Sequence, residues 1–227
     1  MLYMALSCLQ GWPMRAAATE LLDAGAQGLQ LTPGCVPTPA FGRWLDHLGV
    51  RQRRHDGFSW RGLRQPVWDS DGRTLVSAES VHPPRQRPDD DFVDWLDRAA
   101  VCGSAVEVMY PGHWLGTGTE LEAAMDHDLV LAVDVSHLYI QQQAGVLSPT
   151  QLDRVLSYGR VAEVHVSAND GRRDLHRQVT ADSFWLGWAR ERYGDGVPVV
   201  CESYLQRISS DERHAFVEEL HTWMGAV

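Results

Sequence analysis

The sequence predicts a compact α/β fold, a TIM (β/α)₈ barrel, from two observations. Eight short β-rich runs recur along the 227 residues, with amphipathic helical stretches between most of them. This alternation is typical of a parallel sheet. The average of roughly 28 residues per strand–helix unit is close to the roughly 30 of a typical TIM barrel. No glycine-rich phosphate turn follows the first run, which disfavours a doubly wound open sheet. We therefore expect one barrel domain over residues 1–227.

Each element of the barrel is predicted from its pattern. Gly25 and Gly49 end the first two helices, as glycines after a helix C-terminus do. The segment WDSDGRT, between the third and fourth strands, carries a turn signal without helical periodicity, so a non-helical crossover is expected there. The expected strands cover residues 2–7, 28–33, 51–58, 74–82, 105–109, 129–137, 161–167 and 197–203. The expected helices cover residues 14–25, 39–49, 90–100, 120–126, 149–157, 181–193 and 210–224.

The composition is that of an ordinary globular protein, with 44% hydrophobic and 22% charged residues. No apolar run approaches the roughly 20 residues that cross a bilayer, so no membrane partner is expected. The opening MLYMALSCLQGWP lacks the basic region of a signal peptide. The four cysteines have no CxxC spacing, which favours reduced thiols and a cytoplasmic location.

The formal net charge of −10 bears on the choice of partner. Binding to nucleic acid normally needs a basic surface that neutralises phosphates. The arginines at 51–64 and 172–177 form interrupted sets rather than basic blocks. The charge therefore argues against a nucleic-acid partner and favours a peptide or small-molecule substrate.

Histidines and carboxylates stand at the ends of the predicted strands. In a TIM barrel, residues from the carboxyl ends of separate strands converge on the active site. Imidazole nitrogens and carboxylate oxygens suit Zn, Mn or Fe, and a buried cluster of carboxylates is costly without a compensating cation. Any one of these residues could instead cap a loop or pair with an arginine, but the joint pattern predicts a metal site. Its expected ligands are His55, His82, Glu107, Asp134, His137, His165, Asp174, His176 and Glu202.

Other residues have predicted roles around this site. His113, Trp60 and Trp114 are on predicted rim loops and are expected to contact substrate, although packing is the alternative for the tryptophans. Glu163 lies two residues before His165, on the same face by strand alternation but deeper in the barrel. A structural salt bridge is expected for Glu163.

The set Glu107, Asp134–x–x–His137, His165 and Glu202 resembles the metal site of the xylose-isomerase-like TIM barrels. The resemblance implies three alternative activities. Sugar isomerases and epimerases of this superfamily hold one Mn, Mg or Co ion with the equivalents of Glu107, Asp134, His165 and Glu202. The apurinic-site endonucleases add the equivalents of His55, His82, His137 and the Asp174–x–His176 pair, and hold three zinc ions.

The third branch comprises multinuclear non-haem iron enzymes that oxidatively modify ribosomal peptides. The segments HDGFSW, LVLAVDVSHLYI and EVHVSANDGRRDLHRQV resemble its motifs most closely. This likeness implies two or three Fe ions, a peptide or small thiol-containing substrate, and scope for a partner protein that delivers it. Glu107, Glu202 and His137 are the expected catalytic residues. In the isomerase alternative the two glutamates also carry protons and His137 binds a substrate hydroxyl.

Overall fold

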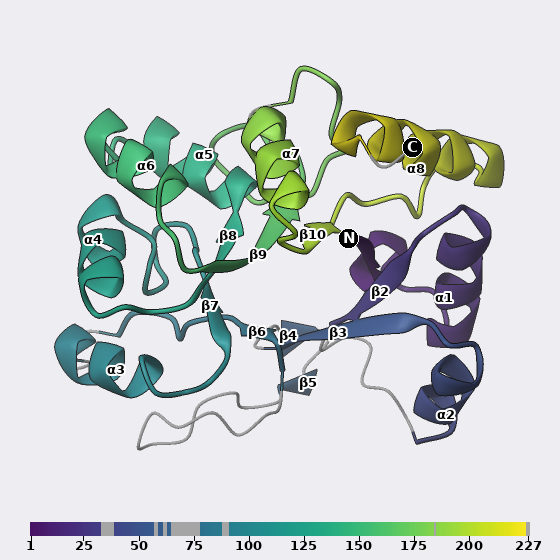
Figure 1. The fold of residues 1–227 in the computed structure, drawn as a ribbon, viewed down its shortest axis with the longest axis horizontal. Coiled ribbons are helices and arrows are strands. Elements are labelled where there is room, and N and C mark those ends of the chain that lie inside the picture. Colours follow the sequence, from purple (N-terminus) through teal and green to yellow (C-terminus); the bar gives the residue numbers. More distant parts are fainter. Residues whose placement is uncertain are drawn as a thin grey trace.

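In the computed structural model, parallel strands close into a barrel. The structure describes residues 1–32, 39–56, 59–60, 63–64, 78–87, 91–183 and 185–225, and only the backbone at 59–60 and 63–64. Around the barrel the strand order is β1-β10-β9-β8-β7-β6-β3-β2, and Figure 1 shows the helices on the outside of these strands. The predicted barrel is confirmed. Its strands are β1 (Leu2–Ala5), β2 (Gly28–Leu31), β3 (Arg51–Asp56), β6 (Ser80–Val81), β7 (Ala105–Glu107), β8 (Leu131–Asp134), β9 (Val161–Val166) and β10 (Val199–Cys201).

Most barrel strands are buried on both faces, as expected where helices cover a parallel sheet, whereas the first residues of β3 are partly exposed. Every residue of β1, β2, β7, β8 and β10 is buried. The parallel register sets the height of each side chain in the barrel. Asp134 at the end of β8 pairs with His165 of β9, and His55 of β3 pairs with Ser80 of β6. Polar residues of separate strands therefore reach the same levels of the barrel.

The helices begin and end at recognisable capping residues. Ser148 and Ser209 form capping boxes with Gln151 and Glu212, which satisfy free amide groups in the first turn. Gly225 ends the last helix in the left-handed conformation, which glycine adopts without steric cost. The helices are α1 (Met14–Asp23), α2 (Pro39–His47), α3 (Phe92–Ala99), α4 (Gly118–Asp126), α5 (Val135–Gln143), α6 (Pro149–Leu156), α7 (Leu186–Gly194) and α8 (Ser210–Met224).

Several predicted boundaries differ from the structure, and three of the differences have a clear local description. The strand expected at 129–137 ends at Asp134, because its side chain caps the amides of Ser136 and His137 and starts α5. The first strand ends at Ala5 and continues as the 3₁₀ helix η1 (Leu6–Leu9). The helix expected from residue 181 starts only at Leu186, after a turn in which Ser183 Oγ accepts from the amide of Thr180 at 2.6 Å.

The described part of the crossover between β3 and β6 contains a small antiparallel pair, β4 (Ser59–Trp60) and β5 (Leu63–Arg64). The turn segment WDSDGRT, on which the predicted non-helical crossover rests, lies outside the described residues. The expected strand at 74–82 is described from residue 78 onward, and its first residues lie outside the described part. Among the described helices, none combines the length and apolar character needed to cross a membrane.

Candidate metal centre

Glu107, at the end of β7, lies between two groups of histidines. Its Oε2 is 2.7 Å from His82 Nε2 and 3.1 Å from His55 Nε2. Its Oε1 is 3.2 Å from His165 Nδ1 and 3.5 Å from His137 Nδ1. Burial opposes ionisation of this carboxylate, but the surrounding histidines hold the pKa of Glu107 well below its ordinary value. A carboxylate with imidazoles at both oxygens has the arrangement needed to bridge two cations.

Four residues from four strand ends form the group that the sequence predicts. Donor atoms of Glu107, Asp134, His165 and Glu202 all lie within 4.8 Å of one another, and all four residues are buried. Glu202 Oε1 is 3.7 Å from His165 Nδ1. Asp134 uses Oδ1 to cap α5, whereas its buried Oδ2 has no hydrogen-bond partner. Burial, together with the nearby carboxylates, raises the pKa of Asp134, a cost that a divalent cation would remove.

A second group shares Glu107 with the first. Donor atoms of His55, His82 and Glu107 also lie within 4.8 Å of one another. The rings of His55 and His82 meet edge to face, with centroids 4.6 Å apart. Burial alone would lower the pKa of His55, but the charge of Glu107 raises it overall. The two histidines therefore face a carboxylate that attracts either protons or metal.

A third group lies beside the others, around Asp174. Asp174 Oδ2 is 3.0 Å from His176 Nε2 and 3.5 Å from His137 Nε2. His137 Nδ1 donates to the carbonyl of Val108 at 2.9 Å, which leaves Nε2 free to bind a cation. On the other side, His176 Nδ1 is 3.8 Å from Glu202 Oε2. All nine predicted ligands thus lie in one connected cluster.

His137 reaches this cluster from the first turn of α5, not from a strand end. His176 has φ +45°, a left-handed conformation in which a non-glycine residue is strained. Its carbonyl accepts from the amide of Tyr204 at 2.7 Å, and the rings of the two residues are 4.8 Å apart. This backbone contact holds the strained loop against the end of β10.

The donor set fits a metal. Four buried donor atoms of the cluster have no hydrogen-bond partner in the described structure: Asp134 Oδ2, His137 Nε2, Asp174 Oδ1 and His176 Nδ1. Buried polar atoms normally have partners, so a group of orphaned ones needs an explanation. Imidazole and carboxylate donors at this spacing are the ligands of Zn, Mn and Fe. The residues present can therefore hold divalent ions.

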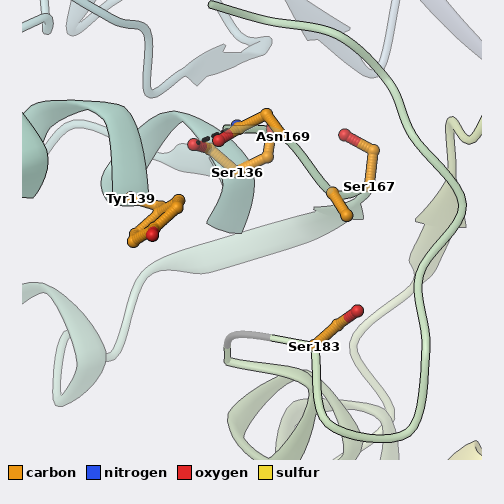
Figure 2. Close-up of a pocket in the computed structure, with 6 residues that line it drawn as sticks. Ser136, Tyr139, Ser167, Asn169 and Ser183 are labelled. Atoms are coloured by element: carbon orange, nitrogen blue, oxygen red, sulfur yellow. Dashed lines mark hydrogen bonds between the residues drawn. The ribbon is translucent and has the colours of Figure 1, made fainter. Parts of the chain in front are cut away.

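Asn169 anchors the loop that carries Asp174 and His176. Its Nδ2 donates to the carbonyl of Ser136 at 2.8 Å, and its Oδ1 accepts from the amide of Gly171 at 2.8 Å. Figure 2 shows the bond between Asn169 and Ser136. It lies beside a pocket of ≈ 260 Å³ lined by Ser136, Tyr139, Ser167, Ala168, Asn169 and Ser183. Ser136 and Ser167 follow the candidate ligands Asp134 and His165 by two residues each. This pocket is therefore built on the same two chain segments as the candidate metal centre.

The three residues predicted to contact substrate lie in different surroundings. Trp114 is buried against Phe92 and Trp95, with ring centroids 4.9 and 6.3 Å apart. It is a core residue, so its expected place on a substrate-facing wall is wrong. The ring of His113 packs on Tyr110, and Tyr110 packs in turn on His137. Burial is the main cause that lowers the pKa of His113 to about 4. The side chain of Trp60 lies outside the described part of the chain.

Sequence reasoning missed the polar residues beneath the cluster. Glu163 pairs with Arg53, as its predicted structural role requires, but it also accepts from His165 Nε2 at 2.6 Å. Ser80 and Gln30, both fully buried, donate to the same carboxylate at 2.6 and 3.0 Å. Strand alternation is the signal that could have found Ser80, because it lies two residues before His82 on the same face.

Comparison with known proteins identifies the fold. No family model matches the chain, and no curated protein sequence matches it. Among solved structures, a xylose isomerase domain protein from Alicyclobacillus acidocaldarius is 14% identical, with a TM-score of 0.61 and 99% of this chain and 100% of that chain covered. An AP endonuclease of family 2 from Brucella melitensis is 14% identical, with a TM-score of 0.63 and 96% and 98% covered.

A third similar structure is 3-keto-D-glucoside 4-epimerase from E. coli, which is 12% identical, with a TM-score of 0.61 and 97% and 98% of the two chains covered. At such low identity these likenesses show the fold alone. The fold is that of the xylose-isomerase-like TIM barrels, as the resemblance of the sequence implies.

Proposed function

We propose that this protein is a multinuclear metalloenzyme that holds two or three ions at the carboxyl end of its barrel. One observation supports this proposal most directly: the two oxygens of Glu107 face different histidines, His55 and His82 at Oε2 and His165 and His137 at Oε1. A single ion would leave half of these donors without a role. Two ions that share Glu107 would use His55, His82 and His165, while His137 turns its Nε2 toward Asp174.

Each group of donors would hold one ion. His55, His82 and Glu107 would hold the first, and Glu107, Asp134, His165 and Glu202 the second. The third would lie between His137, Asp174 and His176, whose donor atoms face one another.

The chemistry that we favour is oxidation, with iron as the metal and a peptide or small thiol-containing molecule as the substrate. Iron would supply dioxygen binding and electron transfer, and imidazole with carboxylate is a donor set that suits it. Buried residues exclude water around the ligands, and Glu107, Glu202 and His137 would fix the position of the reacting groups. The net charge of −10 favours such a substrate over a nucleic acid. A partner protein could deliver a peptide substrate.

The second candidate is a sugar or sugar-acid isomerase or epimerase with one Mn, Mg or Co ion. The four-residue group around His165 supports it, as does the shared fold of the E. coli epimerase. In this case Glu107 and Glu202 would move protons as well as bind metal. An epimerase of this kind has no use for His55 and the Asp174–His176 pair beside its metal, and these residues lie in the cluster. Zinc phosphodiester hydrolysis is a weaker candidate because of the acidic charge.

Metal analysis of protein purified anaerobically, without added metal, tests the proposal. We expect two or three equivalents of metal in the wild type and about one fewer in a His55→Ala variant. His127→Ala is the matched control. His127 lies on the surface at the end of α4, and among the described residues it bonds its own helix and Asp97. One equivalent in both wild type and His55→Ala would overturn the multinuclear proposal and favour the epimerase.

A further inference from the structure

Glu163 lies at the centre of a buried polar network one layer below the candidate ligands. It is fully buried, and its contacts are those of an ionised carboxylate: one ion pair and three hydrogen-bond donors. Arg53 Nε pairs with Oε2. Oε1 accepts from three other side chains: His165 Nε2 at 2.6 Å, Ser80 Oγ at 2.6 Å and Gln30 Nε2 at 3.0 Å. The ion pair with Arg53 already balances the charge, so the three contacts at Oε1 need a separate reason.

The contact with His165 fixes which ring nitrogen can bind metal. Because a carboxylate only accepts hydrogen bonds, the proton of His165 is on Nε2, toward Glu163. Nδ1 also bonds a carboxylate, Glu107 Oε1, at 3.2 Å and lies 3.7 Å from Glu202 Oε1. It is therefore the nitrogen at which a cation between these carboxylates would replace the proton. Carboxylates that hold a ligating histidine in this way set its tautomer and increase its basicity.

The contact with Ser80 extends the same control to His55. The single hydroxyl proton of Ser80 is donated to Glu163, so its oxygen accepts the proton of His55 Nδ1 at 2.9 Å. His55 Nε2 is then the nitrogen at which a cation would replace the proton, and it is 3.1 Å from Glu107 Oε2. His55 and His165 contact opposite oxygens of Glu107. Their donor atoms also lie within 4.8 Å of each other and of Glu202, and their rings meet edge to face 5.0 Å apart.

We propose that Glu163, directly and through Ser80, is a positioning residue for two separate metal positions at once. It sets the tautomers of His165 and His55, so that both rings turn a lone pair toward opposite oxygens of Glu107. This inference relies on the proposed multinuclear site and adds that one buried carboxylate coordinates the assembly of two of its positions.

Co²⁺ titration of the metal-stripped protein, followed by absorbance, measures each binding step. Ser80→Ala leaves His55 Nδ1 without an acceptor, so the tautomer with the proton on Nε2 becomes favoured. We expect this variant to weaken only the step that depends on His55, by about 10–100-fold, as the loss of such supporting contacts does. Glu163→Gln is expected to weaken two steps. An amide has one acceptor oxygen, which cannot serve Arg53 and the three donors at Oε1 together.

Double mutants show which metal-binding step depends on His55 and which on His165. In a His55→Ala background, Ser80→Ala should change no remaining step, whereas Glu163→Gln should still weaken the step at His165. Two controls remove the same group types elsewhere. Glu20→Gln disrupts a carboxylate that also accepts from an arginine and a serine, Arg213 and Ser210, at 2.7 Å each. Ser104→Ala removes a buried hydroxyl that bonds the carbonyl of Ala78.

Both controls should bind Co²⁺ like the wild type, and the melting temperature of each metal-free variant shows whether it folds. If the Glu163→Gln variant folds and still shows every binding step of a multi-step titration, this inference is overturned but the proposed function is not. Ser80→Ala that weakens all steps equally would overturn the relay to His55. A wild type that binds one Co²⁺ would overturn both the proposed function and the inference.

Discussion

Because His176 has a left-handed backbone conformation, the effect of its imidazole and the effect of its backbone strain can be tested separately. At φ +45°, an L residue costs roughly 1–2 kcal/mol, and histidine is near the low end because it tolerates this region better than most residues. His176→Gly and His176→Ala both remove the imidazole, but only glycine removes the strain. We expect the metal-free Gly variant to be more stable than the Ala variant by about 1 kcal/mol.

Thermal unfolding measures this difference. For a chain of 150–250 residues, about 1 kcal/mol corresponds to roughly 2–4 °C in melting temperature. Both variants should also lose about one equivalent of bound metal, since both lack the imidazole that faces Asp174. The pair Asp170→Gly and Asp170→Ala is the control. Asp170 lies in the same loop and is not among the residues with positive φ, so there alanine should be at least as stable as glycine.

A result in which His176→Ala melts at or above His176→Gly would refute the assignment of strain. A result in which both keep the full metal content would refute the role of His176 as a ligand. The two outcomes are independent, because strain is a property of the backbone and metal binding a property of the ring.

Further predictions concern the loop, the protons and the core. Asn169→Ala removes both anchors of the loop and should weaken metal binding at Asp174 and His176 about tenfold, measured by Co²⁺ titration. The metal-free protein should lose stability as pH rises from about 6.5 to about 9. Denaturant unfolding at a series of pH values measures this loss. The pKa of His176 is raised to about 9, against burial, mainly by its bond to Asp174, so its contribution is fully present below 6.5 and is lost as pH passes 9. His176→Ala should show a weaker dependence, because only the contribution of His176 is removed and His55, His137 and His165 keep their raised pKa values. Trp114→Ala should cost about 3–5 kcal/mol of stability without changing metal content, since its ring packs on Phe92 and Trp95.

The sequence predicted the barrel and the ligand cluster for a simple physical reason. Parallel strands buried on both faces are apolar, so a histidine or carboxylate such as His165 or Glu202 is conspicuous in them. The barrel then brings the strand ends to one rim whatever their separation in the chain. The prediction of the barrel did not need the loops, which carry little periodic signal.

The helix α5 was not predicted because it has no polar face. Val135, His137, Leu138, Ile140 and others around its circumference are buried, so the apolar run continues from the strand without a 3.6-residue period. Ser80 and Gln30 were missed for a different reason. A serine or glutamine in a strand has many ordinary roles, and only the closed barrel shows that these two reach Glu163 from across its interior.

The sharing of donors explains why the cluster contains so few residues for the number of ions proposed. Glu107 serves two groups of histidines, and Glu202 lies between His165 and His176. A shared carboxylate places two cations close together. Its negative charge attracts both ions and offsets part of their mutual repulsion. The cost is that a change at Glu107 reaches every group that contacts it. The buried Glu163 network fits this arrangement, because rings that share one carboxylate must be held at fixed angles before any ion arrives.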